Sequence, residues 1–195
     1  ERYQELMREQ KARARAATSF KVDQSRTDAW EDISEGDDSA FVGYDIAEDA
    51  IERARAEAGE MGLSNTAFDV LDVAQLPGEP KYDLITAFDA IHDQKAPDAV
   101  LRGVCNALAP GGRFLMVDFK FSSRVEDNLA NPFAPMYYGI SLMHCMPVSL
   151  AVGGQGLGTV WGEQTARRML AEAGFRDIAV LDTPRPQNYM FVASR

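Results

Sequence analysis

Apolar and polar positions follow two different rhythms between residues 40 and 118. Short apolar runs that fit strands, most of them followed closely by an acidic residue, cover residues 40–44, 66–70, 82–88 and 113–118. Between them, apolar residues recur at helical spacing, and the first such face consists of Ala47, Ile51, Ala54, Ala58 and Met61. Strands that alternate with helices at this spacing predict a parallel sheet wound on both faces.

Glycine and proline predict where the helices begin and end. Gly62 ends the first helix, and Pro97 stands in the first turn of the second, where proline is tolerated. The buried face of this second helix is predicted to hold Val100, Leu101, Val104, Ala107 and Leu108. The sequence Pro110-Gly111-Gly112 is predicted to end it and to turn into a strand over residues 113–118. A third helix is predicted over residues 164–173, with Gly174 as its stop.

The last third of the chain differs in composition from the part before it. Residues 121–160 are rich in Asn, Pro, Gly, Met and Tyr and show no sustained period, which predicts short helices and loops laid over the sheet as a substrate cover. Two short strands are predicted near residues 178–181 and 189–193, and the connection between them is short enough for an antiparallel hairpin. The predicted fold is α/β, with a doubly wound, mostly parallel Rossmann-like sheet that ends in an antiparallel hairpin.

The predicted domain organisation lacks one central element, a glycine-rich cofactor loop. We expect an N-terminal helix and linker over residues 1–35 and one catalytic domain over residues 36–195. Nucleotide-binding domains of this kind normally hold the cofactor on a glycine-rich loop, yet none precedes Phe41. Two interpretations stay open. Either a segment between about residues 17 and 41 is missing from this sequence, or the chain is a degenerate homologue that has lost cofactor binding.

Composition narrows the function classes. The formal net charge of −10 would repel a phosphate backbone, so nucleic acid is not expected as a substrate. The apolar runs are too short to span a bilayer, and we expect a cytoplasmic protein without membrane contact. Cys105 and Cys145 lie far apart and are expected to be reduced thiols. His144 beside Cys145 lacks further ligands, so no metal is predicted.

Several short motifs occur together in a characteristic order. The segments Phe41–Ile46, Phe88–Asp93 and Leu108–Leu115 resemble those of class I S-adenosylmethionine-dependent methyltransferases. A narrower resemblance, to a bacterial subgroup with an N-terminal winged-helix domain, is carried by residues 126–128, 140–145, 156–158 and 161–163. The likeness covers about residues 41 to 195. It implies S-adenosylmethionine as cofactor and S-adenosylhomocysteine as product.

Acidic residues at two successive strand ends fit this cofactor. Asp45 is placed to accept two hydrogen bonds from a ribose diol, although NAD would be held in the same way. Asp72 is placed to accept from the adenine amino group. The alternatives are that Asp45 only stabilises a helix N-terminus and that Asp72 is a turn residue. The predicted cofactor-binding residues are Asp45, Ile46, Leu71, Asp72, Val73 and Phe88.

The predicted catalytic residues, Asp89 and His92, follow the strand that ends beside the transferred methyl group in this fold. A carboxylate there stabilises the sulfonium cation. His92 is a candidate general base toward a hydroxyl or amine, and the alternative is that it only caps or packs. Methyl transfer needs little more than in-line approach, so a base is not a requirement.

Six residues of the cover are predicted to line a substrate pocket, although buried aromatics and methionines are more often ordinary core. They are Asn128, Tyr137, Tyr138, Met143, His144 and Trp161. The predicted function is methyl transfer to an oxygen, nitrogen or carbon nucleophile of a small molecule. The alternatives are an inactive methyltransferase-like binding or regulatory protein and an NAD-dependent oxidoreductase. A homodimer is left open.

Overall fold

A computed structural model describes residues 39–76, 79 and 81–195. The predicted N-terminal helix and linker over residues 1–35 therefore lies outside the described residues. The chain divides into two units at residues 40 and 41. Every helix and strand given below belongs to the second unit, residues 41–195.

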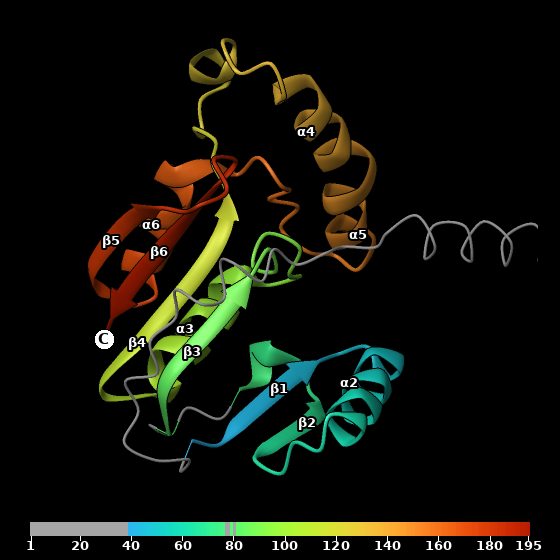
Figure 1. Ribbon diagram of the computed structural model, residues 1–195. Coiled ribbons are helices and arrows are strands. Elements are labelled where there is room, and N and C mark those ends of the chain that lie inside the picture. Colours follow the sequence, from blue (N-terminus) through green and yellow to red (C-terminus); the bar gives the residue numbers. More distant parts are fainter. Residues whose placement is uncertain (1–38, 77–78, 80) are drawn as a thin grey trace, which may run out of the picture. The chain divides into compact units, whose positions relative to one another are not determined.

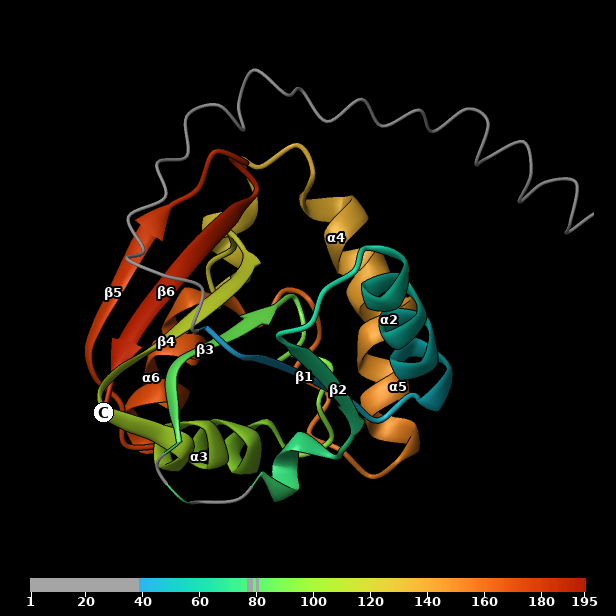
Figure 2. The ribbon, with the colours of Figure 1, turned by 60° about the horizontal axis from the view of Figure 1, so that its bottom comes forward.

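The larger sheet has four strands in the order β3-β4-β6-β5 (Figure 1). Strand β3 (Tyr82–Phe88) runs parallel to β4 (Leu108–Phe119). Strand β6 (Asn188–Ser194) is antiparallel to β4 and also to β5 (Arg176–Asp182). The predicted C-terminal hairpin is confirmed, and Figure 2 shows β5 and β6 side by side.

A second, two-stranded sheet pairs β1 (Phe41–Asp45) with β2 (Thr66–Val70) in parallel. Helix α2 (Glu48–Glu60) connects them and buries Ile51 and Ala58, as its apolar period predicts. Met61 was expected on the same face but is 66% exposed, because the helix ends at Glu60, before Met61.

The sequence predicts one sheet, and the described strands form two. No strand of the described part of the chain pairs with β1 on the side away from β2, or with β3 on the side away from β4. In the topology that the resemblance implies, the first strand pairs with both of these edges. The sequence before Phe41 offers no apolar run that would supply it. The mixed α/β architecture, with parallel pairs and a closing hairpin, agrees with the predicted fold class.

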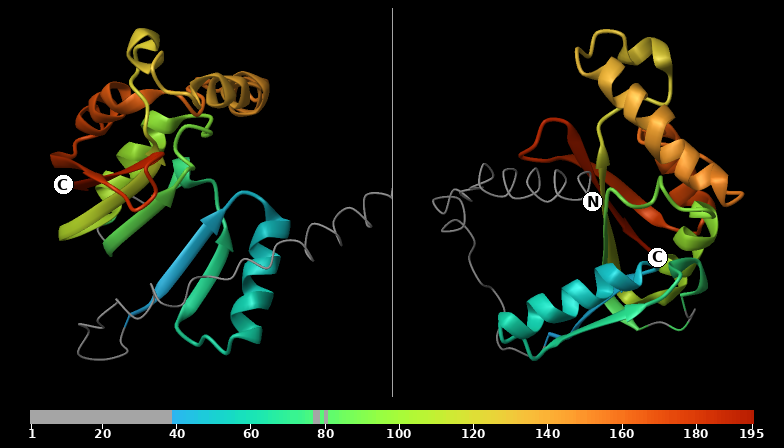
Figure 3. Two further views of the ribbon diagram at one scale, coloured as in Figure 1. Left: turned by 45° about the horizontal axis from the view of Figure 1, so that its top comes forward. Right: turned by 90° about the vertical axis from the view of Figure 1, so that its right-hand side faces the viewer.

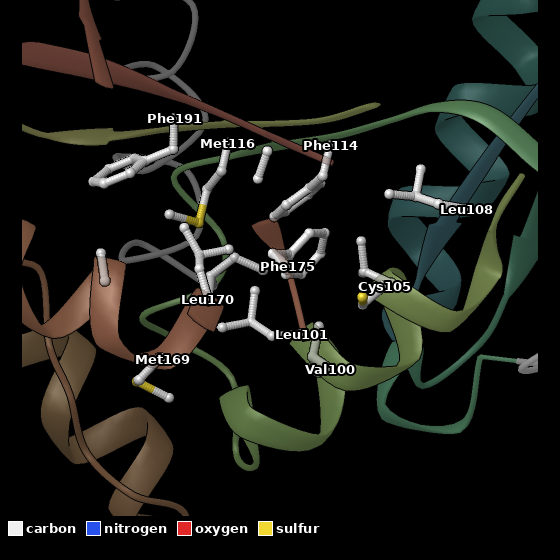
Figure 4. Close-up of a cluster of buried hydrophobic side chains, with 14 of the residues drawn as sticks. Val100, Leu101, Cys105, Leu108, Phe114, Met116, Met169, Leu170, Phe175 and Phe191 are labelled. Carbon is white, nitrogen blue, oxygen red and sulfur yellow. The ribbon is translucent and has the colours of Figure 1, made fainter. Parts of the chain in front are cut away.

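The main core lies on one face of the four-stranded sheet. Helices α3 (Pro97–Ala107) and α6 (Gly162–Glu172) cover this face, and the predicted buried residues of α3 are buried. Figure 4 shows Val100 and Leu101 of α3 and Leu170 of α6 in one cluster with strand side chains. The strand side chains of this cluster include Phe114, Met116 and Phe191.

The predicted boundary between α3 and β4 was wrong. Strand β4 starts at Leu108, directly after the helix, and includes the Pro-Gly-Gly sequence that was expected to end the helix. Leu108 pairs with Tyr82, and a register shift between Tyr82 and Leu84 accommodates the irregular residues. A β-carbon on Gly112 would lie 2.9 Å from the Tyr82 carbonyl oxygen, so only glycine fits this close approach.

The cover consists of short helices, as predicted. A 3₁₀-helix (Val125–Asn128) precedes α4 (Ala134–Ile140), which continues through a π-helical turn (Ser141–Cys145) into α5 (Met146–Ala151). Figure 3 shows the last three as one continuous rod. Within the described residues, no helix is both long and apolar enough to cross a membrane.

Candidate functional site

The ends of β1 and β2 carry two exposed carboxylates. Asp45 is the last residue of β1, and Asp72 follows β2 by two positions. The backbone N–H of Leu71 donates to the Asp45 carbonyl oxygen at 2.9 Å. This bond extends the parallel pairing beyond the strands and brings the two strand ends together.

Each carboxylate also accepts a hydrogen bond from the backbone two residues further along the chain. Asp45 Oδ1 accepts from the backbone N–H of Ala47 at 2.8 Å, and Asp72 Oδ1 accepts from Ala74 N–H at 3.0 Å. Asp72 thereby caps the 3₁₀-helix Val73–Gln75, whereas Asp45 precedes Ala47, the N-cap of α2, which has no side-chain cap. A carboxylate offers about four acceptor positions, so one such bond orients the group without exhausting it.

The apolar residues predicted to contact the cofactor differ in exposure. Ile46, directly after β1, is 72% exposed, and Phe88, the last residue of β3 in the other sheet, is 64% exposed. Leu71 and Val73, on either side of Asp72, are half-buried.

Asp89 occupies a strained position directly after β3. Its φ of 53° lies in the left-handed region, which is uncommon outside glycine and is concentrated at functional sites. Its backbone N–H donates to the Val117 carbonyl oxygen at 2.9 Å, which holds the residue beside β4. Burial raises the pKa of its carboxyl to about 6, the nearby charges of Asp118 and Asp93 add to the rise, and His92 opposes it.

His92 lies at the centre of a buried polar cluster. Its side chain is 2% exposed, and Nδ1 is 3.2 Å from Oδ2 of Asp118, at the end of β4. The same oxygen accepts the indole N–H of Trp161 at 3.0 Å. Nε2 of His92 lies 3.4 Å from Oδ1 of Asp93. No role was predicted for Asp118 or Asp93, although Asp118 lies at the end of an apolar run, as Asp45 and Asp89 do.

The six predicted pocket residues do not converge on one place. Asn128 is buried and bound internally: its side chain accepts from Ser122 N–H at 2.9 Å and donates to the Ser122 carbonyl at 2.8 Å and to the Tyr138 hydroxyl at 2.9 Å. Met143 is 79% exposed and His144 is exposed, whereas Trp161 belongs to the His92 cluster.

Tyr137 is the predicted pocket residue that lines a cavity. Its ring lies 4.7 Å from that of Phe119 and 5.2 Å from that of Phe121, between ring centroids. The cavity has a volume of about 280 Å³. It is lined by Lys120, Phe121, Asn131, Phe133, Tyr137, Pro186 and Gln187. An aromatic wall of this kind suits a flat or apolar small molecule.

Both cysteines are free and buried. Burial raises the pKa of the Cys105 and Cys145 thiols, which keeps them protonated near neutral pH. Cys145 Sγ lies 2.7 Å from Thr159 Oγ1, whereas the neighbouring His144 is exposed. The two neighbouring side chains therefore occupy different environments.

This geometry defines a class of protein. Parallel strands with a carboxylate at or just after the ends of β1, β2 and β3, and a closing antiparallel hairpin, are typical of α/β domains that bind nucleotide-like ligands at the carboxyl ends of their strands.

Comparison with known proteins identifies the family within this class. Residues 19–174 match the family model of a methyltransferase domain, so the chain belongs to that family. A structure of PigF with SAH superimposes with a TM-score of 0.59 at 20% identity, over 80% of this chain and 43% of that one. A putative O-methyltransferase from Nostoc punctiforme gives a TM-score of 0.60 at 23% identity, over 80% and 45%. These structures support the fold.

One further relative matches only a short part of the sequence. The alanine–tRNA ligase of Salinibacter ruber is 43% identical over 77 residues, which is 35% of this chain and 8% of the ligase. The chain thus spans less than half of each of these relatives. The resemblance to class I methyltransferases is confirmed, and the narrower one to the winged-helix subgroup stays a prediction.

Proposed function

We propose that the protein transfers the methyl group of S-adenosylmethionine to a small molecule. The observation that carries this proposal is the pair of exposed carboxylates, Asp45 and Asp72, at the joined ends of β1 and β2. A nucleoside offers a diol and an exocyclic amine, and two acceptors at adjacent strand ends suit those two groups. The bound SAH in the PigF structure supports the same cofactor chemistry.

Each residue near the strand ends has a proposed role. Asp45 accepts the ribose hydroxyls and Asp72 the adenine amino group, with Leu71 and Val73 flanking the ring. Ile46 and Phe88 supply exposed apolar surface that the cofactor covers. Asp89, half-exposed beside β4, stabilises the sulfonium cation and accepts a proton where the acceptor loses one.

The methyl acceptor is proposed to be a small molecule. The net charge of −10 disfavours a nucleic acid, and the aromatic wall around Tyr137 suits a small ring compound. A homodimer and a cytoplasmic location stay predictions.

Calorimetric titration with S-adenosylhomocysteine tests the cofactor assignment. Asp45→Asn keeps an oxygen that accepts the Ala47 N–H but loses the charge, and we expect it to weaken binding by about 1 to 3 kcal/mol. The matched control is Asp49→Asn, an exposed carboxylate in the first turn of α2, which should leave the affinity unchanged. Equal affinities for wild type and Asp45→Asn would remove the role of Asp45.

The second candidate function is an inactive binding or regulatory protein on the same fold. The absence of a glycine-rich loop before Phe41 favours it, because that loop normally cradles the cofactor. The same titration separates the two, since the wild-type protein would then bind neither S-adenosylmethionine nor S-adenosylhomocysteine.

A further inference from the structure

The contacts of the two His92 ring nitrogens indicate which of them carries a proton. The first of these nitrogens is Nδ1. Both oxygens of Asp118 accept hydrogen bonds, Oδ1 from the backbone N–H of Phe119 at 2.8 Å and Oδ2 from the indole N–H of Trp161 at 3.0 Å. Both Asp118 oxygens therefore act as acceptors. His92 Nδ1, 3.2 Å from Oδ2, must carry a proton to face it favourably.

The other ring nitrogen faces a second carboxylate. Asp93 Oδ1 is buried and lies 3.4 Å from His92 Nε2, a contact between charges that does not have hydrogen-bond geometry, and the Cys145 thiol also faces Asp93. A lone pair on Nε2 would repel this oxygen. A proton on Nε2 supplies the positive charge that a buried carboxylate oxygen requires.

The charges around the ring agree with this assignment. Burial lowers the pKa of His92, but the hydrogen bond and charge of Asp118 and the charges of Asp93 and Asp89 outweigh it, so the pKa is raised above its usual value. The groups that face the ring come from three parts of the chain, and Trp161 before α6 joins the cluster through Asp118. They are Asp89 and Asp93 after β3, Asp118 and Phe119 of β4, and Cys145 of the π-helical turn.

We propose that His92 is a buried imidazolium that positions Asp89, and that it is not the general base. The ring ties the segment after β3 to the end of β4, and through Asp118 to Trp161 and the start of α6. Its Nδ1 also lies 3.7 Å from Asp89 Oδ1, so its charge helps to hold the carboxylate of that strained residue. The role of Asp89 rests on the proposed function, whereas the protonation state of His92 does not.

Nuclear magnetic resonance of ¹⁵N-histidine-labelled protein tests the protonation state directly. The sequence contains two histidines, so the exposed His144 serves as an internal reference, and a His144→Gln variant assigns the signals. We expect both nitrogens of His92 to keep protonated shifts at about pH 7, because the carboxylates around the ring raise its pKa. A ¹⁵N chemical shift typical of an unprotonated or metal-bound nitrogen, on either His92 nitrogen at that pH, would overturn the proposal.

A variant pair tests what keeps the ring protonated. Asp118→Asn removes the charge that faces Nδ1, and His92 should then lose its proton at least tenfold more readily. Asp182→Asn, which removes an 82% exposed carboxylate beyond this cluster, should leave the His92 titration unchanged. An Asp118→Asn spectrum identical to that of wild type would contradict the assigned contact.

A pH profile distinguishes positioning from catalysis. If protonation of Asp89 causes the rate of methyl transfer to fall at low pH, His92→Gln should move that fall to higher pH. The variant removes a positive charge near Asp89 and so raises the pKa of its carboxyl. A fall that vanishes in His92→Gln would instead identify His92 as the base and overturn the proposal. A wild-type profile without any such fall would count against the role of Asp89, and with it against positioning of Asp89 by His92. The labelled spectra would still decide the protonation state.

Discussion

At the scale of single residues, Asp89 combines three features that are costly for folding. It has a left-handed backbone, its side chain is half removed from water, and its carboxyl pKa is raised to about 6. Burial is the main cause of the raised pKa, and the carboxylates Asp118 and Asp93 add to it. A half-buried carboxyl with a strongly raised pKa beside a strand end is a candidate for chemistry.

The raised pKa of Asp89 predicts a pH-dependent cofactor preference. Above about pH 6 the carboxyl is ionised and attracts the sulfonium of S-adenosylmethionine, and below it the carboxyl is neutral. S-adenosylhomocysteine has an uncharged sulfur. The ratio of the two affinities, measured by calorimetry, should therefore fall by a few-fold, about 1 kcal/mol, as the pH drops from about 7.5 to 5.

Asp89→Asn is the matching variant for this prediction. Asparagine tolerates the left-handed conformation, so the fold should be retained. A carboxyl whose folded pKa exceeds its unfolded value stabilises the protein at low pH and loses that contribution as the pH rises through about 6. In the variant, the ratio of the S-adenosylmethionine and S-adenosylhomocysteine affinities should no longer vary with pH. The contribution of residue 89 to the free energy of unfolding should also no longer vary with pH. A ratio that still varies with pH would assign the effect to another group.

At the scale of elements, the start of α6 is fixed by one close approach. Gly162 has a φ of +78°, and a β-carbon there would lie 2.2 Å from the backbone nitrogen of Ser123. The Ser123 hydroxyl donates to the Trp161 carbonyl at 2.7 Å, so the same junction holds Trp161 against Asp118. The helix start and the His92 cluster are therefore coupled by the backbone.

Gly162→Ala should destabilise the protein by about 2 kcal/mol or more, because the added methyl group overlaps backbone atoms and the left-handed conformation is strained. Urea unfolding measures the effect. Gly103→Ala is the control, since its β-carbon would meet no atom closer than 3.6 Å and alanine favours the middle of α3. Equal stabilities of the two variants would show that the junction relaxes without cost.

At the scale of the whole described chain, the two sheets differ in their support. Strand β4 pairs on both sides and contributes Phe114 and Met116 to the main core. Strands β1 and β2 pair only with each other among the described residues, and a two-stranded sheet is marginal by itself. Stability is thus concentrated in the four-stranded sheet.

Hydrogen exchange should show this difference residue by residue. Paired backbone amides of β4 and β6 should exchange only through global unfolding, whereas those of β1 should exchange at least tenfold faster through local opening. Mass spectrometry of the exchanged protein measures both. Equal protection of β1 and β4 would mean that another strand completes the smaller sheet. The missing glycine-loop strand would then no longer support the inactive alternative.

The apolar periods of the sequence determined most of the elements. Apolar runs predicted β2 and β3, because their pattern records which residues an element buries. Pro97 predicted the start of α3, and the short connection before residue 189 predicted the hairpin. Boundaries were wrong where a close contact overrode local signals. Pro110-Gly111-Gly112 is usually a turn, but here it lies within β4, because the register shift opposite Tyr82 accommodates it.

The sequence by itself thus determined the fold class, the family resemblance and the carboxylates at the strand ends. Only the tertiary structure decided that Asp118, Asp93 and Trp161 meet around His92, and that Asn128 and Trp161 are bound internally. The physical reason is that a local pattern reports the burial of each element separately. Hydrogen bonds between groups 26 or 43 positions apart depend on how the packed elements bring distant residues together.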